Sequence, residues 1–220
     1  LFTVSADGLY GLATAYMLIR TGEFDVVAVE AHSKASDMLT FADIVAFALD
    51  PIFNRPLGGH PYYIAGMEMT RFLHETGNTK EQCAQVVVKN KRNALKNACA
   101  AYAANITIDQ VLESEPYFYP LSRLDISPLA DGCIVMVLAS EDAAKKLTDK
   151  PVWIKGVGWN AETPWLETRE WGNAIYTELA AKMAYKIAGI NNPQKEIEFA
   201  EINDIFSYKE LQHLEALKLC

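Results

Sequence analysis

The 220-residue sequence predicts an α/β fold in which a helix-and-loop insert interrupts the alternation of strands and helices. Two apolar runs of strand length, residues 25–31 and 132–139, each lie next to a stretch with apolar residues at helical spacing. Between them, residues 50–127 contain several predicted helices and a loop rich in Pro and Gly at residues 50–61. Half of the residues are hydrophobic and 22% are charged, which is the composition of a globular protein.

The N-terminal part is predicted to form a strand–helix–strand unit with a buried parallel sheet. Residues 1–4 are apolar and precede a turn in which Asp7 can cap the following helix. Gly22 ends that helix, and residues 25–31 follow as a continuous apolar strand. Such units are right-handed, and their two strands run in the same direction.

The insert is predicted to contain helices near residues 65–75 and 79–96, the second of which begins with a capping box at Thr79. Later elements follow from the same signals. We expect a buried strand at residues 132–139, a helix at 141–147, a strand at 151–158, a long helix at 168–188, a strand at 199–202 and a final helix from Ser207.

The charge balance and the cysteines exclude several classes of protein. Twenty Lys and Arg residues against 28 Asp and Glu residues leave a net charge of −8, which argues against binding to nucleic acid. No apolar run approaches the roughly 20 residues of a membrane helix. Cys83, Cys99, Cys133 and Cys220 have no metal-ligand or disulfide spacing, and we expect the first three to be small core residues. These features predict a cytoplasmic protein without a metal site.

Both ends of the sequence fall inside predicted secondary structure. Leu1 begins within a strand, and residues 211–220 continue an amphipathic helix. We therefore expect the chain to be an internal piece of a longer protein, incomplete at both ends.

Four stretches of the sequence resemble thiolases, and the archaeal and sterol-carrier-protein branch in particular. They are TGEFDVVAVEAHSKASD, MTRFLHETGNTKEQCAQVVVKNKRNALKN, PLSRLDISPLADGCIVMVLASEDAAKKL and AEINDIFSYKELQHLEALKLC. The resemblance implies the thiolase fold, a layered αβαβα arrangement of two similar halves with mixed sheets. It assigns residues 1–49 and 128–150 to the N-terminal half, residues 50–127 to the loop-domain insert and residues 151–220 to the start of the C-terminal half.

Thiolases make or break a carbon–carbon bond beside a coenzyme A thioester. The resemblance therefore implies a coenzyme A thioester as substrate and no covalently bound cofactor. The family's nucleophilic cysteine, which lies just before a helix, aligns with Ser5. A serine hydroxyl is a weaker nucleophile without a strong base beside it, which argues against ordinary cysteine-dependent thiolysis. Ser5 is either the counterpart of the nucleophile or, as we favour, a turn residue.

The family's second oxyanion element, NEAF or HDxF, aligns with residues 203–206. Asn203 is therefore the main candidate for a group that orients a water or donates to a thioester oxygen, with a turn cap as the alternative interpretation. His32 is a second candidate because catalytic groups gather where strands end in α/β folds. His60 lies in a Gly-His-Pro triplet like the family's histidine motif, but in the wrong half, and is interpreted as a loop residue.

Charged residues on the predicted helices have two interpretations. Lys89 and Arg92 belong to a basic cluster in an acidic chain, and they either contact the phosphates of coenzyme A or form a solvated helix face. His74 and His213 lie on amphipathic helices and are expected to face solvent.

Three functions are compatible with these residues. The first is an acyltransferase of lipid metabolism that resembles acetyl-CoA acetyltransferase. The second is a cysteine-less lyase that cleaves acyl-CoA substrates by a retro-aldol reaction, for which a base and an oxyanion hole suffice. The third is a non-catalytic, thiolase-like subunit of an acyl-CoA-processing complex. The resemblance also implies a homodimer or homotetramer, and a small OB-fold acyl-CoA-binding protein as a partner.

Overall fold

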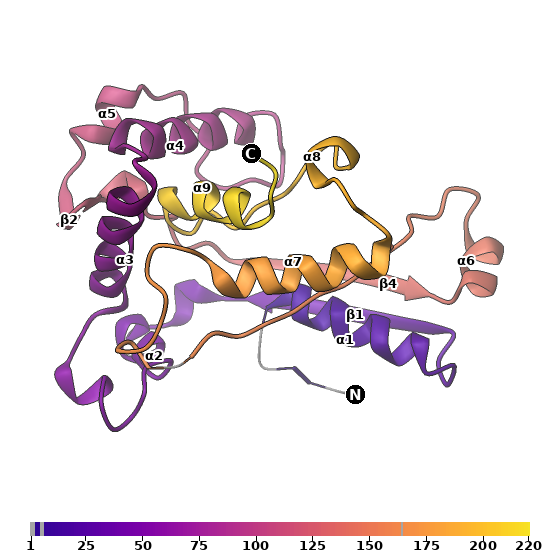
Figure 1. The fold of residues 1–220 in the computed structure, drawn as a ribbon. Helices are drawn as coiled ribbons and strands as arrows, with labels where there is room; N and C mark the ends of the chain where they lie inside the picture. Colours follow the sequence, from indigo (N-terminus) through magenta and orange to yellow (C-terminus); the bar gives the residue numbers. More distant parts are fainter. Residues whose placement is uncertain (1–2, 5–6, 164) are drawn as a thin grey trace.

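The computed structural model describes residues 3–4, 7–163 and 165–220. Its longer elements are, in chain order, α1 (Gly8–Arg20), β1 (Val26–Ser33), α2 (Phe41–Ala46), α3 (Pro61–Thr76), α4 (Lys80–Ala94), α5 (Ile108–Leu112), β2 (Pro116–Phe118), β3 (Leu121–Ser122), β4 (Gly132–Ala139), α6 (Glu141–Leu147), α7 (Ile175–Ala188), α8 (Pro193–Glu196) and α9 (Ser207–Ala216) (Figure 1). Short 3-10 helices occur at Ala35–Asp37 (η1), Arg55–Leu57 (η2) and Arg123–Asp125 (η3). None of the helices in the described ranges is long and apolar enough to cross a membrane.

β1 and β4 form a long two-stranded antiparallel sheet. The register runs from Val26 opposite Ala139 to Ser33 opposite Gly132. The last residue of β1, Ser33, lies opposite the first residue of β4, Gly132, so the two strands run in opposite directions. The expected parallel pairing of residues 25–31 with residues 1–4 involves two residues outside the described part of the chain.

α1 covers one face of this sheet. Asp7 caps the helix as predicted, since its Oδ1 accepts a hydrogen bond from the Tyr10 amide at 3.0 Å. The helix packs closely on the strand, and a Cβ on Gly11 would lie 3.0 Å from Val29 Cγ1. The small residues of α1 therefore set its distance from β1.

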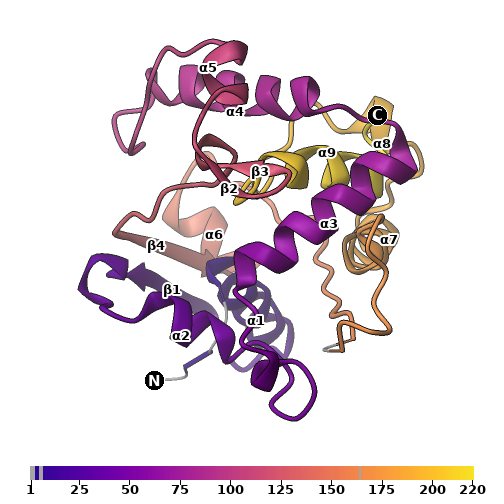
Figure 2. The ribbon, with the colours of Figure 1, turned by 90° about the vertical axis from the view of Figure 1, so that its left-hand side faces the viewer.

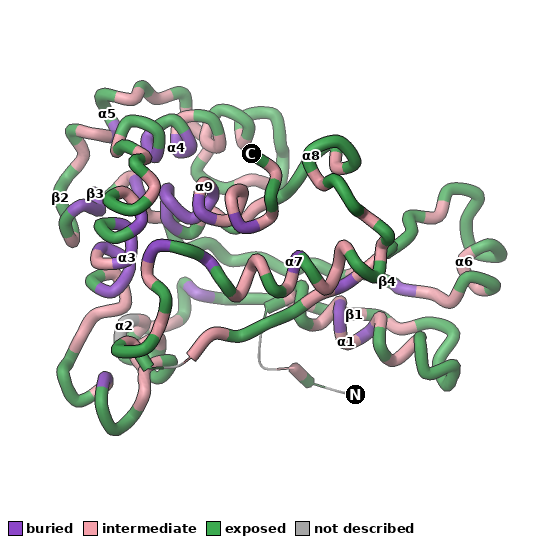
Figure 3. Tube along the Cα trace, in the orientation of Figure 1, coloured by how far each residue is buried: buried purple, intermediate pink, exposed green. Residues whose placement is uncertain are grey.

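The opposite face of the sheet is exposed (Figure 3). Val135 and Val137 of β4 are 63% and 65% exposed. The prediction that residues 132–139 are buried is therefore wrong for this face, because the described residues cover the sheet from the α1 side. The expectation of a buried Cys133 is wrong for the same reason, and Cys99 is also exposed, whereas Cys83 is buried as predicted.

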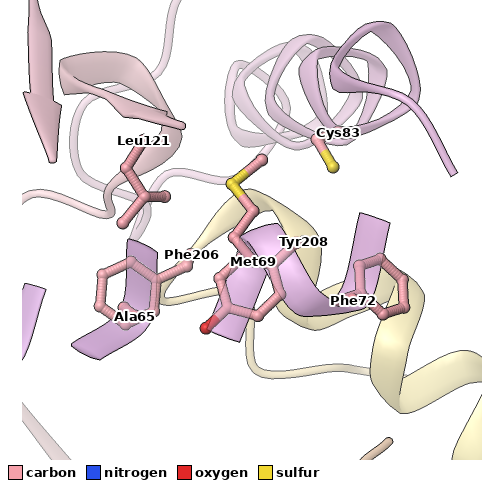
Figure 4. Close-up of a cluster of buried hydrophobic side chains, with 7 residues drawn as sticks. All are labelled: Ala65, Met69, Phe72, Cys83, Leu121, Phe206 and Tyr208. Carbon is pink, nitrogen blue, oxygen red and sulfur yellow. The ribbon is translucent and has the colours of Figure 1, made fainter. Parts of the chain in front are cut away.

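The core of the insert is completed by a helix from far along the chain. Figure 4 shows its buried side chains, which are Ala65, Met69 and Phe72 of α3, Cys83 of α4, Leu121 of β3, and Phe206 and Tyr208 at the start of α9. A second cluster joins Ala84 and Val87 of α4 to Val111 of α5. α9 therefore lies among the helices of the insert, as Figure 2 also shows.

Several predicted boundaries are confirmed and others are wrong. The capping box at Thr79 opens α4, and α6 has its predicted bounds. The long helix predicted at residues 168–188 begins only at Ile175. Residues 151–158 and 199–202 are not strands, because no described strand lies beside either of them to complete a hydrogen-bonded ladder.

The segment at residues 151–158 instead packs on α7. Cβ atoms on Gly156 and Gly158 would lie 2.4 Å and 1.9 Å from the carbonyl oxygens of Ala184 and Ala180. The two glycines thus allow this segment to approach the helix backbone directly.

Gly158→Ala should lower the free energy of unfolding by about 1–3 kcal/mol, because the added methyl group has no room beside the α7 backbone. Urea denaturation measures this change. The control Gly59→Ala places its methyl group in open space and should change stability by less than about 0.5 kcal/mol. Equal effects of the two substitutions would contradict the close packing on α7.

Candidate functional site

Asn203 lies in the turn that leads into α9. Its side chain is exposed, and its Oδ1 accepts a hydrogen bond from the Ile205 amide at 3.0 Å. The neighbouring residues Ile202 and Asp204 line a cleft of about 890 Å³, whereas Asn203 itself is not one of the lining residues. Because the carbonyl end of the Asn203 side chain is occupied by its own turn, the amide nitrogen is the end that can donate to a bound oxygen.

The cleft lies between α4, the segment that follows α4, and the approach to α9. Its charged lining residues are Lys89, Lys91, Asp125, Glu198, Glu201, Asp204 and Glu210. Carboxylates outnumber lysines, so the cleft is negative overall. Asn90 Nδ2 donates to Asp204 Oδ2 at 2.8 Å and to Glu210 Oε2 at 2.7 Å. Among the residues that the structure describes, no group of three or more His, Cys, Asp or Glu side chains is arranged to hold a metal ion.

A buried polar cluster lies where α9 meets α3, and it is centred on Glu68. Lys209 Nζ lies 2.5 Å from Glu68 Oε1, and Tyr208 donates its hydroxyl proton to Oε2 at 3.0 Å. Arg169 Nη2 lies 3.6 Å from Oε1. Burial, together with the Glu68 charge, raises the pKa of Tyr208 well above its usual value. Glu68 can remain buried because several donors and charges face it.

Lys209 connects this cluster to α7. Its ammonium donates to Glu68 Oε1, to Gln212 Oε1 at 2.9 Å and to the Tyr176 hydroxyl oxygen at 3.1 Å. These three bonds use all the donors of an ammonium group. Lys209 is therefore fully hydrogen-bonded although it is almost completely buried.

His213 lies at the end of the same set of contacts. Its Nε2 lies 3.1 Å from the Tyr176 hydroxyl oxygen. Burial and the Lys209 charge lower the pKa of His213 to about 4, although Glu68 and the Asn203 backbone act in the opposite direction. The ring is thus neutral near pH 7. We refer to the side chains of Glu68, Lys209, Tyr176 and His213 as the α9 network.

The prediction that His213 faces solvent is wrong. α7 packs against α9 on this side, and the imidazole is only partly accessible. His74, by contrast, is exposed as predicted.

Of the other predicted catalytic residues, the structure describes His32, and it does not bring this residue to Asn203. Ser5 lies outside the described residues. His32 is exposed on β1, with its Nδ1 3.3 Å from Glu30 Oε1. β1 and α9 lie apart in both views of the ribbon (Figures 1 and 2).

The two basic candidates on α4 differ in their surroundings. Lys89 lines the cleft and forms an ion pair with Glu210, while its side chain remains about half exposed, at 52%. Arg92 is exposed and is not a lining residue of the cleft. His60 has a structural role, since its Nδ1 accepts the Tyr62 amide at 3.1 Å and caps α3.

The α9 network was missed by the sequence analysis, although one signal for it was present. Ile64, Glu68 and Phe72 follow each other at intervals of four and are all buried, so a charge occupies the apolar stripe of α3. A charge in that position predicts a buried partner. Nothing local identified Tyr208 or Lys209 as that partner, because both lie more than 100 residues away in sequence.

No protein-family model matches the sequence. The "Acetyl-CoA acetyltransferase" of Methanothermobacter thermautotrophicus is 30% identical over 96% of this chain and 55% of its own length. Human "Sterol carrier protein 2" is 27% identical over 98% of this chain and 42% of its own length. Among solved structures, the "Ltp2-ChsH2(DUF35) aldolase" has a TM-score of 0.79 and 25% identity, over 97% of this chain and 56% of its own.

These likenesses define a thiolase-type α/β fold and confirm the predicted fold class. The chain belongs to the thiolase superfamily, and its relatives include the archaeal acetyl-CoA acetyltransferases and sterol carrier protein 2. It spans about half the length of the archaeal relatives that it matches.

Glu68→Gln should lower the free energy of unfolding by about 3 kcal/mol, because Lys209 would be left as a buried cation without its counter-charge. Urea denaturation at pH 7 measures the loss. The control Glu141→Gln removes an exposed ion pair with Lys145 and should leave the midpoint nearly unchanged. If both variants unfold at the same urea concentration, the α9 network does not stabilise the fold.

The low pKa of His213 predicts a defined pH dependence of stability. Between pH 6.5 and about 4, the unfolded chain binds a proton at this ring that the folded chain does not bind. Stability should therefore fall as the pH drops through this interval, by at most about 3 kcal/mol from His213. His213→Phe removes that part of the dependence. The unfolding midpoints of the native protein and of His213→Phe are measured at pH 7 and at pH 5. If the midpoint falls equally in both proteins, His213 does not have a lowered pKa.

Proposed function

We propose that this chain carries part of the oxyanion-stabilising machinery of a thiolase-like enzyme that forms or cleaves a carbon–carbon bond in coenzyme A thioesters. The observation that carries the proposal is the hydrogen bond that holds the Asn203 side chain in its turn. Its Oδ1 accepts from the Ile205 amide, which leaves Nδ2 of this exposed side chain as the group that can donate to a ligand. The relationship to an acetyl-CoA acetyltransferase supports a thioester as the ligand.

An amide donor of this kind acts on the charge that develops during the reaction. When the α-carbon of a thioester becomes an enolate, or its carbonyl is attacked, negative charge gathers on the thioester oxygen. Asn203 Nδ2 donates to that oxygen and transfers no proton itself. A pre-oriented donor lowers the barrier because it needs no reorganisation as the charge forms.

In an acyltransferase, Ser5 would be the acyl acceptor. Its Oγ attacks the thioester carbonyl, a base takes the hydroxyl proton, and coenzyme A leaves as the thiol. The acyl group is then transferred to the carbanion of a second thioester. This is the reaction class that the acetyltransferase relatives support.

A retro-aldol lyase is the second candidate, and the aldolase among the solved structures favours it. Here a base takes the hydroxyl proton of a β-hydroxyacyl thioester, and the α–β carbon bond breaks to release an aldehyde or ketone. Asn203 stabilises the thioester enolate until it is protonated. No acyl-enzyme forms, so a serine in place of the family's cysteine is compatible with this reaction. The third candidate, a non-catalytic subunit, requires neither step.

We further propose that Lys89 and Arg92 contact the phosphates of coenzyme A. Arg92 is exposed and can reach a ligand at the surface of α4, while Lys89 would exchange Glu210 for a phosphate. We also propose a cytoplasmic homodimer or homotetramer. The name of the solved aldolase pairs Ltp2 with ChsH2(DUF35), which supports a second protein as partner, and we propose a small OB-fold acyl-CoA-binding protein.

The test is an assay of the complete protein with acetyl-CoA and, separately, with a β-hydroxyacyl-CoA. Asn203→Ala should lower kcat by about 10²–10³ in whichever reaction occurs, because one oxyanion donor is lost. Asn105→Ala, at an exposed position in the loop before α5, is the matched control and should retain full activity.

Mass spectrometry then separates the candidates. An acetyl group on Ser5 identifies the acyltransferase, and cleavage of the β-hydroxyacyl-CoA without such an adduct identifies the lyase. If the complete protein catalyses neither reaction with its partner present, the enzymatic proposal fails and the non-catalytic subunit stands. Full activity of Asn203→Ala would remove Asn203 from the mechanism.

A further inference from the structure

We propose that Asn90 of α4 is a positioning residue for Asn203, on which it acts through the side chain of Asp204. The inference rests on the proposed function of Asn203 and names the group that fixes its turn. It follows from the hydrogen bonds that join the insert to each of the two residues after Asn203.

Asn203 and the two residues that follow it form a short closed turn. Oδ1 of Asn203 accepts the Ile205 amide proton at 3.0 Å, so Asp204 is the middle residue of a side-chain-to-backbone turn. The ring of atoms that this hydrogen bond closes includes the backbone of Asp204. The position of the Asn203 side chain therefore changes whenever Asp204 or Ile205 moves.

Asn90 holds the middle residue of this turn. Its Nδ2 donates to Asp204 Oδ2 at 2.8 Å and to Glu210 Oε2 at 2.7 Å. A primary amide has two protons on its nitrogen, so each carboxylate receives one of them. Asp204 precedes α9 and Glu210 lies within its first turns, so a single amide joins α4 to both sides of the bend that leads into α9.

The charges around Asn90 explain why the turn depends on this amide. Because one nitrogen contacts both carboxylates, the negative charges of Asp204 and Glu210 lie close together and repel each other. Lys89 forms an ion pair with the other oxygen of Glu210, whereas the donor at Asp204 is the neutral Asn90 amide. Without that donor, the Asp204 carboxylate would turn away from Glu210, and the Asn203 turn would move with it.

The insert also holds the third residue of the turn. The Ser127 amide donates to the Ile205 carbonyl oxygen at 2.9 Å, while the Ile205 amide binds Asn203 Oδ1. Asn90 therefore supplies a side-chain contact to the turn, and Ser127 supplies a backbone contact. With Oδ1 occupied inside the turn, these two contacts set the direction in which Nδ2 of Asn203 can donate.

Hydrogen exchange in the complete protein tests the inference without an assay of activity. Exchange of the Ile205 amide should accelerate about tenfold in Asn90→Ala, because one anchoring hydrogen bond is lost. Asp204→Asn, whose Oδ1 can still accept the Asn90 proton, should keep the native rate. The control Gln85→Ala removes an exposed amide from the same helix and should keep it too.

A pair of substitutions separates an effect through Asp204 from a general loosening of α9. In an Asp204→Ala background, Asn90→Ala should cause no further acceleration of Ile205 exchange. The amide of Leu214, which lies inside α9, should exchange at its native rate in Asn90→Ala. The inference is overturned if Asn90→Ala leaves Ile205 exchange unchanged, if its effect is undiminished in the Asp204→Ala background, or if Leu214 exchange accelerates equally.

Activity of the complete protein provides an independent measurement. Asn90→Ala should lower kcat about tenfold with little change in KM, as expected when a donor to the transition state is displaced, and Gln85→Ala should not. If Asn203→Ala is fully active, the proposed function fails, while the exchange measurements still decide the role of Asn90. If Asn203→Ala is inactive and Asn90→Ala has native exchange and kcat, the inference fails alone.

Discussion

The buried ion pair between Glu68 of α3 and Lys209 of α9 is the contact on which the candidate site depends. It joins the insert to the segment that carries Asn203, across 141 residues of sequence. Ser207, two residues before Lys209, also joins α9 to a buried carboxylate of the insert. Its hydroxyl donates a proton to Asp125 Oδ1 at 2.6 Å. An unpaired charge at these depths costs several kcal/mol, so α9 can hold this position only when the insert is folded around it.

The ion pair between Glu68 and Lys209 shows how the insert stabilises α9. Its helices supply the counter-charges that allow a polar helix start to be buried, and α7 adds Tyr176 from the opposite side. A turn held by buried charges moves less than a loop held by solvent-exposed contacts. The start of α9 is therefore held by contacts from α3 and α7, two elements that are distant from it in sequence.

Local signals predicted the local structure well. The capping box at Thr79 and the bounds of α6 depend on neighbouring residues, and both are confirmed. The cap predicted for the last helix at Ser207 is wrong, because the Ser207 hydroxyl donates to Asp125 instead of to its own helix. Residues 151–158 were predicted as a strand from their composition, but a strand also needs a partner, which composition does not report. The candidate site divides in the same way. Asn203 was proposed from its motif, whereas the contact of His213 with Tyr176 of α7 joins residues that no local pattern relates.

The uncovered face of the β1–β4 sheet has a practical consequence. Val135 and Val137 present an apolar surface beside strand edges that have no neighbour among the described residues. Attraction between such surfaces strengthens on warming, so a solution of the isolated 220-residue chain should cloud when heated and clear again on cooling if the folded molecules themselves associate. Purification near 4 °C, in moderate concentrations of arginine or glycerol, suits a surface of this kind.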